Sequence, residues 1–286
     1  MIDGKTELLG VFGYPVSHSK SPVMHNALFK ELNINAVYVA LSPAPEALKN
    51  ALAGFKALHF RGANITIPYK EKVIPFLDKL SPISEFTGSV NTLYYENGKL
   101  CGTTTDPYGA LKNLETVCSS LKNKKIAILG NGGAAKAISF ALLEKQTELT
   151  IVSRNQEKGN ALASKLKNIF ESEIQVLSFE KFNATPFDII LNTTPVGMHP
   201  DIFANPLPNA KFHASQIVYD IIYTPKETAL LKQAKAQGAT ILNGEGMLVY
   251  QGLSSFKLWF REETKNLSDE YLATIMKTSL LRNQND

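Results

Sequence analysis

A glycine-rich segment near the middle of the chain has the composition of a phosphate-binding turn. It follows the apolar run Lys125–Leu129 and precedes an alanine-rich stretch typical of a helix. Gly130 would allow a tight turn, Gly132 would let the backbone approach a pyrophosphate, and Ala135 would permit close packing of helix on strand. The amino end of that helix would direct its N–H groups at the phosphates. A purely structural turn is the alternative. The context predicts a dinucleotide site whose contacts are Gly130, Asn131, Gly132, Gly133 and Ala134.

The end of the next predicted strand indicates which dinucleotide is bound. An NAD enzyme commonly has Asp or Glu about 20 residues after the glycine turn, where the carboxylate holds the ribose 2′-hydroxyl. Here the corresponding residues are Ser153, Arg154 and Asn155, with Lys158 shortly after them. Positive charge without a carboxylate suits a 2′-phosphate. The sequence therefore favours NADP, with an ordinary basic loop as the alternative.

Polar residues elsewhere are ambiguous when each is taken alone. Ser17 and Ser19 fit a turn ahead of a helix, and Lys70 fits a solvated surface. Asp106 fits the N-cap of a helix that begins at Pro107. Their order and spacing along the chain are more informative than their types.

Together with their neighbours, these residues form a series of motifs that resembles the shikimate dehydrogenase family. The resemblance runs from about Leu9 to Gln251, which is nearly the whole chain. So many motifs in the same order are a specific signal. They are Phe12–Pro22, Asn64–Lys70, Val90–Thr92, Thr105–Gly109, Gly130–Ala135, Asn192–Met198, Asp220–Tyr223 and Gly244–Gln251.

The resemblance implies an NADPH-dependent, reversible reduction of 3-dehydroshikimate to shikimate, a step of aromatic amino acid biosynthesis. It implies that Ser17, Ser19 and Tyr223 hold the substrate carboxylate, which suits hydroxyl donors near a helix amino end. A dense set of donors and acceptors would bind the ring hydroxyls and reject analogues that leave them unpaired. That set comprises Asn64, Thr66, Asn91, Asp106 and Gln251. The cofactor would also contact residues beyond the glycine turn, namely Thr193, Gly244 and Met247.

Lys70 and Asp106 are the pair that the resemblance assigns to the chemistry. Hydride arriving at a ketone carbon leaves negative charge on the oxygen, and a nearby ammonium both stabilises that charge and donates a proton. In the reverse direction the same group accepts the proton of an alcohol. We therefore expect Lys70 to be the acid, base and electrostatic stabiliser, with Asp106 orienting it.

Two segments depart from the family pattern. The family's Asn-Thr-Asp is Thr104-Thr105-Asp106 here, so an amide is lost while Asp106 is kept. The family's Asn-Arg-Thr followed by Arg is Ser153-Arg154-Asn155 with Lys158, where a point charge replaces a planar fork. We expect recognition of the 2′-phosphate to be retained but weaker.

Two other functions fit the same scaffold. One is a quinate/shikimate dehydrogenase that uses NAD and accepts a substrate with an extra ring hydroxyl. The other is a regulatory NADP-binding protein without turnover, and the presence of both Lys70 and Asp106 speaks against it. A nucleic-acid partner has only the basic strip Lys122–Lys125 behind it and is not expected.

Alternating strand and helix patterns predict an α/β protein of two domains. The first part should have strands at Leu8–Phe12, Val37–Leu41 and Asn64–Ile67. A helix should begin after Ser21 as its N-cap. Asn97-Gly98 between apolar segments predicts a β-hairpin.

The second part continues with six predicted strands, at residues 125–129, 148–153, 175–177, 188–192, 217–222 and 239–242. Thr224–Glu227 predicts a capping box at a helix start, and Gly238 predicts the end of that helix. From Gly246 the chain should be helical and return to the first domain. One face of that helix would carry Met247, Tyr250, Gln251, Ser254 and Leu258.

The expected organisation follows from this order of elements. Residues 1–105 and 245–286 would form an α/β substrate domain with a mostly parallel sheet. Residues 106–244 would form a Rossmann-type NADP-binding domain. Two crossings of the chain would leave a cleft between the domains, where ligands commonly bind.

The bulk composition sets the class of protein. The 286 residues are 44% hydrophobic and 20% charged, as in a soluble globular protein, with a small net charge of +4. Cys101 and Cys118 form no metal-binding pattern, so no metal is expected. No apolar run approaches the roughly 18 residues of a membrane helix. The first residues do not resemble a signal peptide. We expect a cytoplasmic enzyme, monomeric or homodimeric, with no membrane partner.

Overall fold

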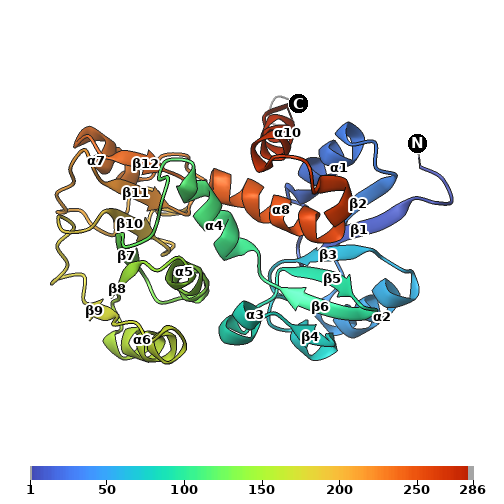
Figure 1. The fold of residues 1–286 in the computed structure, drawn as a ribbon, viewed down its shortest axis with the longest axis horizontal. Coiled ribbons are helices and arrows are strands. Elements are labelled where there is room, and N and C mark those ends of the chain that lie inside the picture. Colours follow the sequence, from blue (N-terminus) through green and yellow to red (C-terminus); the bar gives the residue numbers. More distant parts are fainter. Residues whose placement is uncertain (1, 283–286) are drawn as a thin grey trace. The chain divides into compact units, whose positions relative to one another are not determined.

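The computed structural model describes residues 2–282 and divides the chain into two units, each built around a six-stranded sheet. The first unit comprises Met1–Thr105 and Val249–Asp286, and the second comprises Asp106–Leu248. The chain returns to the first unit inside helix α8 (Glu245–Trp259), a few residues later than the sequence predicts. Figure 1 shows the helices and strands of each unit.

The sheet of the first unit is mixed. Its strands lie in the order β2-β1-β3-β5-β6-β4. The pairs β1–β2, β1–β3 and β4–β6 are parallel, while β3–β5 and β5–β6 are antiparallel. The prediction of a mostly parallel sheet thus holds for three pairs of five. The strands are β1 (Glu7–Phe12), β2 (Ala36–Leu41), β3 (Gly62–Ile65), β4 (Lys79–Leu80), β5 (Thr92–Glu96) and β6 (Lys99–Thr103).

The antiparallel pair β5–β6 follows from the predicted hairpin, which is confirmed. Asn97 and Gly98 connect β5 to β6 with φ angles of 51° and 74°. A two-residue hairpin turn of this type needs positive φ at both central residues, which Asn and Gly tolerate. β5 and β6 must therefore run in opposite directions.

The two faces of this sheet pack against different helices. Ala63 and Ile65 of β3 lie in the apolar cluster that includes Phe55 of helix α2 (Leu48–Ala57). Side chains alternate along a strand, so Gly62 and Asn64 face the other side. There a Cβ on Gly62 would lie only 2.1 Å from Nε1 of Trp259, the last residue of α8. Close contact between β3 and α8 therefore requires glycine at this position.

The C-terminal part of the first unit is divided into three helices joined by short segments, and it is not one long helix. Helix α1 and helix α10 pack side by side, as Figure 1 shows. Helix α8 ends at Trp259, and two further helices follow it. Besides α2 and α8, the helical segments are α1 (Ser21–Glu31), α3 (Pro82–Thr87), α9 (Arg261–Thr264), α10 (Asp269–Arg282), η1 (Pro45–Ala47) and η2 (Ile74–Phe76).

The second unit has a sheet in which every strand pair is parallel. Its order is β12-β11-β10-β7-β8-β9, which is the Rossmann order with β7 as the first strand. Helices α5 and α6 lie beside β7, β8 and β9, and α7 lies beside β11 and β12 (Figure 1). The strands are β7 (Lys125–Leu129), β8 (Glu148–Val152), β9 (Gln175–Leu177), β10 (Ile189–Asn192), β11 (Ile217–Asp220) and β12 (Thr240–Leu242). The helices are α4 (Asp106–Glu115), α5 (Gly133–Glu144), α6 (Gln156–Phe170) and α7 (Ala229–Ala236).

The predicted capping box at Thr224–Glu227 is wrong. Helix α7 begins at Ala229, and its N-cap is Thr228, whose Oγ1 accepts a hydrogen bond from the Leu231 amide. The same hydroxyl donates to the buried Asp220 carboxylate at 2.7 Å. A tertiary hydrogen bond thus decides where the helix starts. The predicted end is confirmed, since α7 stops at Ala236 and Gly238 has a φ of 88°.

Within residues 2–282, no helix combines the length and the apolar character needed to cross a membrane.

An imidazole side chain lies in the core of the first unit. His25 of α1 is fully buried and stacks on Tyr38, with ring centroids 4.4 Å apart. It also contacts the rings of Phe256 and Trp259. Within residues 2–282, neither ring nitrogen has a partner at hydrogen-bonding geometry. Burial lowers the pKa of His25 to about 3, so the imidazole is neutral in the folded protein.

This histidine should make the first unit sensitive to acid. His25 in the unfolded chain takes up a proton below its ordinary pKa of 6.5, while the folded protein holds it neutral. Its contribution to stability is therefore present above that value and is lost as the pH falls toward the folded-state pKa. From about pH 7.5 to about pH 5, the free energy of unfolding should fall by about 2 kcal/mol through this residue. Urea unfolding followed by fluorescence of Trp259, the single tryptophan, measures it.

The substitution His25→Leu should flatten this pH dependence. The control His59→Gln replaces an exposed histidine of the same unit, leaves His25 in place, and should keep the wild-type slope. Equal slopes in the wild type and in His25→Leu would contradict the assignment.

Candidate active site

Two predicted loops lie side by side at the carboxyl ends of β1 and β3. The loop after β1 carries Ser17 and Ser19, and the loop after β3 carries Thr66. The Thr66 amide donates to the Phe12 carbonyl at 2.8 Å. The Tyr14 amide donates to a carbonyl of the second loop at 3.1 Å. Backbone hydrogen bonds thus hold the loop after β1 against the loop after β3.

Gly13 allows this approach of the two loops. A Cβ at this position would lie 2.4 Å from Cγ2 of Thr66 and 3.1 Å from the side chain of Val16. The first distance is too short for two carbon atoms, and the second is tighter than an ordinary contact. The glycine of the serine motif is therefore needed for packing against Thr66.

The serines lie at the amino end of α1, but the predicted cap is wrong. Ser21 is the first residue of the helix and Lys20 precedes it without a side-chain cap. Oγ of Ser19 instead accepts a hydrogen bond from the Ser21 amide at 3.3 Å. A serine hydroxyl that accepts in this way can still donate its hydrogen. Ser19 is half-buried and Ser17 is exposed, so both can face an anion.

Backbone hydrogen bonds join the segment Asn64–Lys70 to the segment Val90–Thr92. The Val90 amide donates to the Lys70 carbonyl at 2.8 Å, and the Ile65 amide donates to the Asn91 carbonyl at 2.8 Å. Lys70 is half-buried. The structure therefore brings the segments of Ser19, Thr66, Lys70 and Asn91 to one edge of the first sheet.

A buried hydrogen-bond network connects the predicted asparagines. Nδ2 of Asn64 donates to the Asn91 carbonyl at 3.1 Å and to Oγ of Ser255 at 2.9 Å. The Thr105 amide donates to Oδ1 of Asn91 at 2.9 Å, and the Thr92 hydroxyl donates to the same oxygen at 2.7 Å. Polar groups without water must find such partners.

Gln251 reaches this network from α8. Nδ2 of Asn91 lies 3.5 Å from Oε1 of Gln251, and the Gln251 side chain is half-buried. Ser255 lies one helical turn further along the same helix, so both residues share one face. The structure therefore brings Asn64, Asn91 and Gln251 together.

Four residues of the network were not among the predicted site residues: Tyr38, Thr92, Thr105 and Ser255. Ser255 follows Gln251 by four positions, and this helical spacing was a usable signal. Tyr38 lies in an apolar strand, where the alternation of side chains gives no sign of a polar role.

The other predicted substrate residues, Asp106 and Tyr223, belong to the second unit. Asp106 is the first residue of α4 and follows Thr105 directly in the chain. Tyr223 lies half-exposed in the loop after β11. The pairing of Asp106 with Lys70 stays a prediction.

The glycine turn of the second unit has the geometry of a phosphate cradle. Gly130 follows β7 with a φ of 110°, and Gly132 is the N-cap of α5. A Cβ on Gly130 would lie 2.9 Å from Oγ1 of Thr193, so this glycine is required by its neighbours. Gly132 and Gly133 face open space, with no atom within 4 Å of a Cβ. The backbone is therefore accessible where a pyrophosphate would lie.

The segment after β8 is organised by side chains of the same turn. Nδ2 of Asn131 donates to Oγ of Ser153 at 2.7 Å, and that hydroxyl donates to the Asn155 carbonyl at 2.8 Å. Oδ1 of Asn155 caps α6 by accepting from the Lys158 amide at 2.9 Å. The side chains of Arg154 and Lys158 are exposed. The residues present therefore fit a phosphate-bearing adenosine.

Asp220 ties together the loops that follow β10 and β11. This fully buried carboxylate accepts hydrogen bonds from Asn192 Nδ2 at 3.1 Å, from the Ile222 amide at 3.1 Å and from Thr228 Oγ1 at 2.7 Å. Burial raises the pKa of Asp220, and the three donors oppose that shift. In the loop after β10, Thr193 donates its hydroxyl to the Leu129 carbonyl at 2.7 Å, which holds it beside the glycine turn.

Gly244 and Met247 lie at the start of α8. A Cβ on Gly244 would come within 1.8 Å of the Ile221 carbonyl oxygen, so packing explains this glycine. Met247 is half-buried. Their contact with a cofactor stays a prediction.

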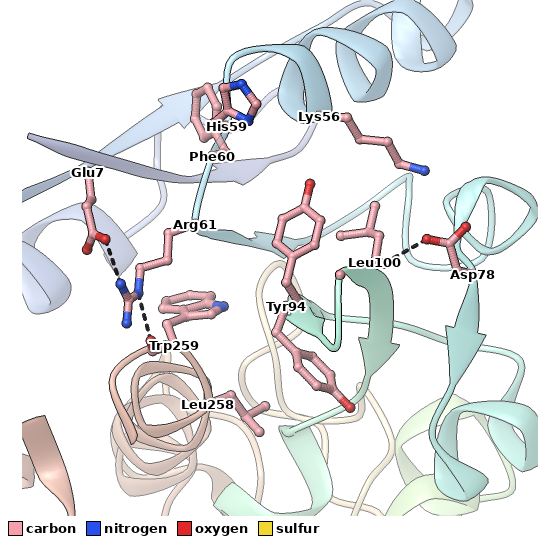
Figure 2. Close-up of a pocket in the computed structure, with 12 residues that line it drawn as sticks. Glu7, Lys56, His59, Phe60, Arg61, Asp78, Tyr94, Leu100, Leu258 and Trp259 are labelled. Carbon is pink, nitrogen blue, oxygen red and sulfur yellow. Dashed lines mark hydrogen bonds and ion pairs between the residues drawn. The ribbon is translucent and has the colours of Figure 1, made fainter. Parts of the chain in front are cut away.

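A hollow of about 760 Å³ lies at the opposite edge of the first sheet (Figure 2). Glu7 at the start of β1, Arg61 just before β3, and Trp259 help to line it. Nη1 of Arg61 donates to Glu7 at 2.6 Å and Nε donates to the Trp259 carbonyl at 2.7 Å. The Arg61 guanidinium is thus bonded to other residues of the protein. Ligands of open α/β sheets bind beyond the carboxyl ends of the parallel strands, whereas this hollow lies at the amino ends of β1 and β3. We place the candidate site at the Asn64 edge instead.

Comparison with known proteins agrees with this geometry. The family model described as "Shikimate dehydrogenase substrate binding domain" matches residues 11–93, and "Shikimate / quinate 5-dehydrogenase" matches residues 112–200. The chain is 43% identical to the shikimate dehydrogenase (NADP(+)) of Methanococcus vannielii, over 97% of this chain and 100% of that protein.

Solved structures show the same similarity. A shikimate dehydrogenase crystallised with NADP+ is 38% identical, with a TM-score of 0.88 over 99% of this chain and 97% of the other. A shikimate 5-dehydrogenase from Listeria monocytogenes, in complex with shikimate and NAD, is 34% identical, with a TM-score of 0.88 over 96% and 98%. This chain therefore belongs to the shikimate dehydrogenase family.

Proposed function

We propose that this chain is an NADP-dependent shikimate dehydrogenase, which reversibly reduces 3-dehydroshikimate to shikimate. The observation that carries the proposal is the 43% identity to the Methanococcus vannielii enzyme over that enzyme's whole length. The open backbone at Gly132 and Gly133 and the basic end of β8 support a phosphorylated dinucleotide. NADPH, when bound, supplies the hydride.

The first unit binds the substrate at the Asn64 edge of its sheet. Ser17 and Ser19 hold the carboxylate with hydroxyl donors at the amino end of α1, where the helix dipole favours an anion. Tyr223 of the second unit adds a third hydroxyl. The ring hydroxyls bind the polar side chains of the network and its surroundings, which are Asn64, Thr66, Asn91, Asp106 and Gln251.

Lys70 and Asp106 carry the proton transfer. The Lys70 ammonium stabilises the negative charge that develops on the ketone oxygen and donates a proton to it. During oxidation of the alcohol the Lys70 amine takes the proton back. Asp106 orients the lysine and accepts a hydrogen bond from a ring hydroxyl.

The second unit binds the cofactor through the turn Gly130–Ala134 and the segment Ser153–Lys158. Arg154 and Lys158 pair with the 2′-phosphate, because both are exposed cations and no carboxylate stands at the end of β8 itself. Thr193, Gly244 and Met247 complete the cofactor site. The cytoplasmic location and the oligomeric state stay predictions of the sequence.

An NAD-dependent quinate/shikimate dehydrogenase is the second candidate, because the matching family description names both substrates. Initial rates with shikimate and with quinate, each with NADP+ and NAD+, separate the two. We expect shikimate with NADP+ to be the best combination. Faster turnover of quinate with NAD+ would establish the alternative, and NADPH binding without any turnover would establish a regulator.

Replacing the lysine should abolish most of the chemistry. Lys70→Ala should lower kcat by roughly 10²-fold or more, on the usual scale of general acid–base catalysis. The control Lys72→Ala removes an exposed lysine two residues away and should leave kcat near the wild-type value. Steady-state oxidation of shikimate measures both. An unchanged kcat with a raised KM in Lys70→Ala would make Lys70 a binding residue.

Replacing the arginine after β8 should weaken cofactor discrimination. Arg154→Ser removes a charged hydrogen-bond donor for the 2′-phosphate, so the ratio of kcat/KM for NADP+ over NAD+ should fall by about 10- to 100-fold. The matched control Lys165→Ser changes an exposed cation further along α6 and should keep the ratio. A ratio that Arg154→Ser leaves unchanged would place 2′-phosphate recognition elsewhere.

A further inference from the structure

The Asn64 side chain is held from one side by Tyr38, a residue of the edge strand β2. The Tyr38 hydroxyl donates to Oδ1 of Asn64 at 2.7 Å. Burial raises the pKa of Tyr38 well above its ordinary value, so the hydroxyl keeps its hydrogen. Tyr38 is only 1% exposed and cannot itself reach a ligand.

Two consecutive residues of α1 fix the position of Tyr38. Oδ1 of Asn26 accepts from the Tyr38 amide at 3.0 Å, and Nδ2 of Asn26 donates to the Tyr38 carbonyl at 2.8 Å. His25 stacks on the phenol ring with an interplanar angle of 19°. Asn26 therefore makes the two backbone hydrogen bonds that a neighbouring strand would make to Tyr38, while His25 packs on the face of its ring.

Ser255 holds the Asn64 side chain from the other side. Its Oγ accepts from Nδ2 of Asn64 at 2.9 Å and lies 2.8 Å from Oγ1 of Thr92 and 3.2 Å from Oγ1 of Thr105. Ser255 is fully buried, so it too cannot reach a ligand. It connects helix α8 to the first residue of β5, Thr92, and to Thr105, which follows β6.

Backbone groups determine the direction of these hydrogen bonds. The Asn91 carbonyl can only accept, so the Asn64 atom that faces it must be the amide nitrogen. The oxygen of Asn64 is then left for Tyr38, whose hydroxyl must donate. Likewise the Thr105 amide can only donate, so it meets Oδ1 of Asn91, and Nδ2 of Asn91 turns toward Gln251.

We infer that Tyr38 and Ser255 are positioning residues of the substrate site, which act through Asn64. The inference rests on the proposed function, because it takes Asn64 as a ligand of a substrate hydroxyl. Asn64 and Asn91 are 6% and 3% exposed, whereas Tyr38 is 1% exposed and Ser255 is fully buried. Tyr38 and Ser255 prevent the Asn64 amide from rotating, and a substrate hydroxyl therefore meets the second lone pair of Oδ1 in one fixed direction.

Tyr38→Phe tests the inference. The substitution leaves Oδ1 of Asn64 without its donor in a buried site, so KM for shikimate should rise by about 5- to 100-fold. KM for NADP+ should stay within about twofold, because its proposed binding residues lie in the second unit. Ser255→Ala should act in the same direction. The control Thr264→Val removes another buried hydroxyl of the first unit, bonded at 2.7 Å to the Phe260 carbonyl, and should leave KM for shikimate unchanged.

A double-mutant cycle separates positioning from general destabilisation. If Tyr38 acts through Asn64, then Tyr38→Phe should change KM for shikimate little in an Asn64→Ala background. Fully additive effects, or an unchanged KM in Tyr38→Phe, would overturn the positioning role alone. Absence of shikimate oxidation by the unaltered enzyme would instead overturn the proposed function, and the positioning role with it.

Discussion

The Asn64 edge of the first sheet depends on two backbone groups of buried residues. The Asn91 carbonyl can only accept and the Thr105 amide can only donate, and together they decide which way both asparagine side chains point. The Tyr38 hydroxyl then donates to Asn64, and the Thr92 hydroxyl donates to Asn91. A half-satisfied network of this kind would cost more than an apolar core. The same bonds that stabilise the fold thus set the pattern of donors and acceptors that a polyhydroxylated ring would meet.

In the second unit, a buried carboxylate has a similar role in holding neighbouring segments together. Asp220 is buried at the end of β11, where desolvation raises its pKa, and three donors converge on it, one from the end of β10 and two from the loop after β11. One of them is the Thr228 hydroxyl, which also caps α7. The carboxylate therefore fixes the loops at the carboxyl edge of this sheet. Thr193 lies in the loop after β10, and its hydroxyl donates to the carbonyl of Leu129, the last residue of β7. This hydrogen bond links that loop to the strand that precedes the glycine turn.

Sequence reasoning succeeded where local chemistry is sufficient and failed where distant partners decide. The Asn97-Gly98 hairpin and the glycine turn depend on φ angles that few residues adopt, so their sequences are diagnostic. The start of α7 was misplaced because a tertiary bond from Thr228 to Asp220 selects it. Ser21 was taken as a cap, although Ser19 accepts its amide. The role of Tyr38 had no local signal, since only the fold brings its hydroxyl to Asn64.

Two of the departures from the family pattern, Thr104 and Lys158, fall at positions whose side chains do not make the hydrogen bonds described above. Thr104 replaces the family's asparagine, yet Oδ1 of Asn91 accepts from the Thr105 backbone amide and Nδ2 of Asn91 donates to the Thr105 hydroxyl. Lys158 replaces an arginine, yet the start of α6 is fixed by the Lys158 backbone amide and the Asn155 side chain. Each of these two substitutions therefore changes one side chain, buried at Thr104 and exposed at Lys158, and leaves the described hydrogen bonds intact. Differences in ligand preference within such a fold can then arise one contact at a time, because the networks that hold the contacts are made by other atoms.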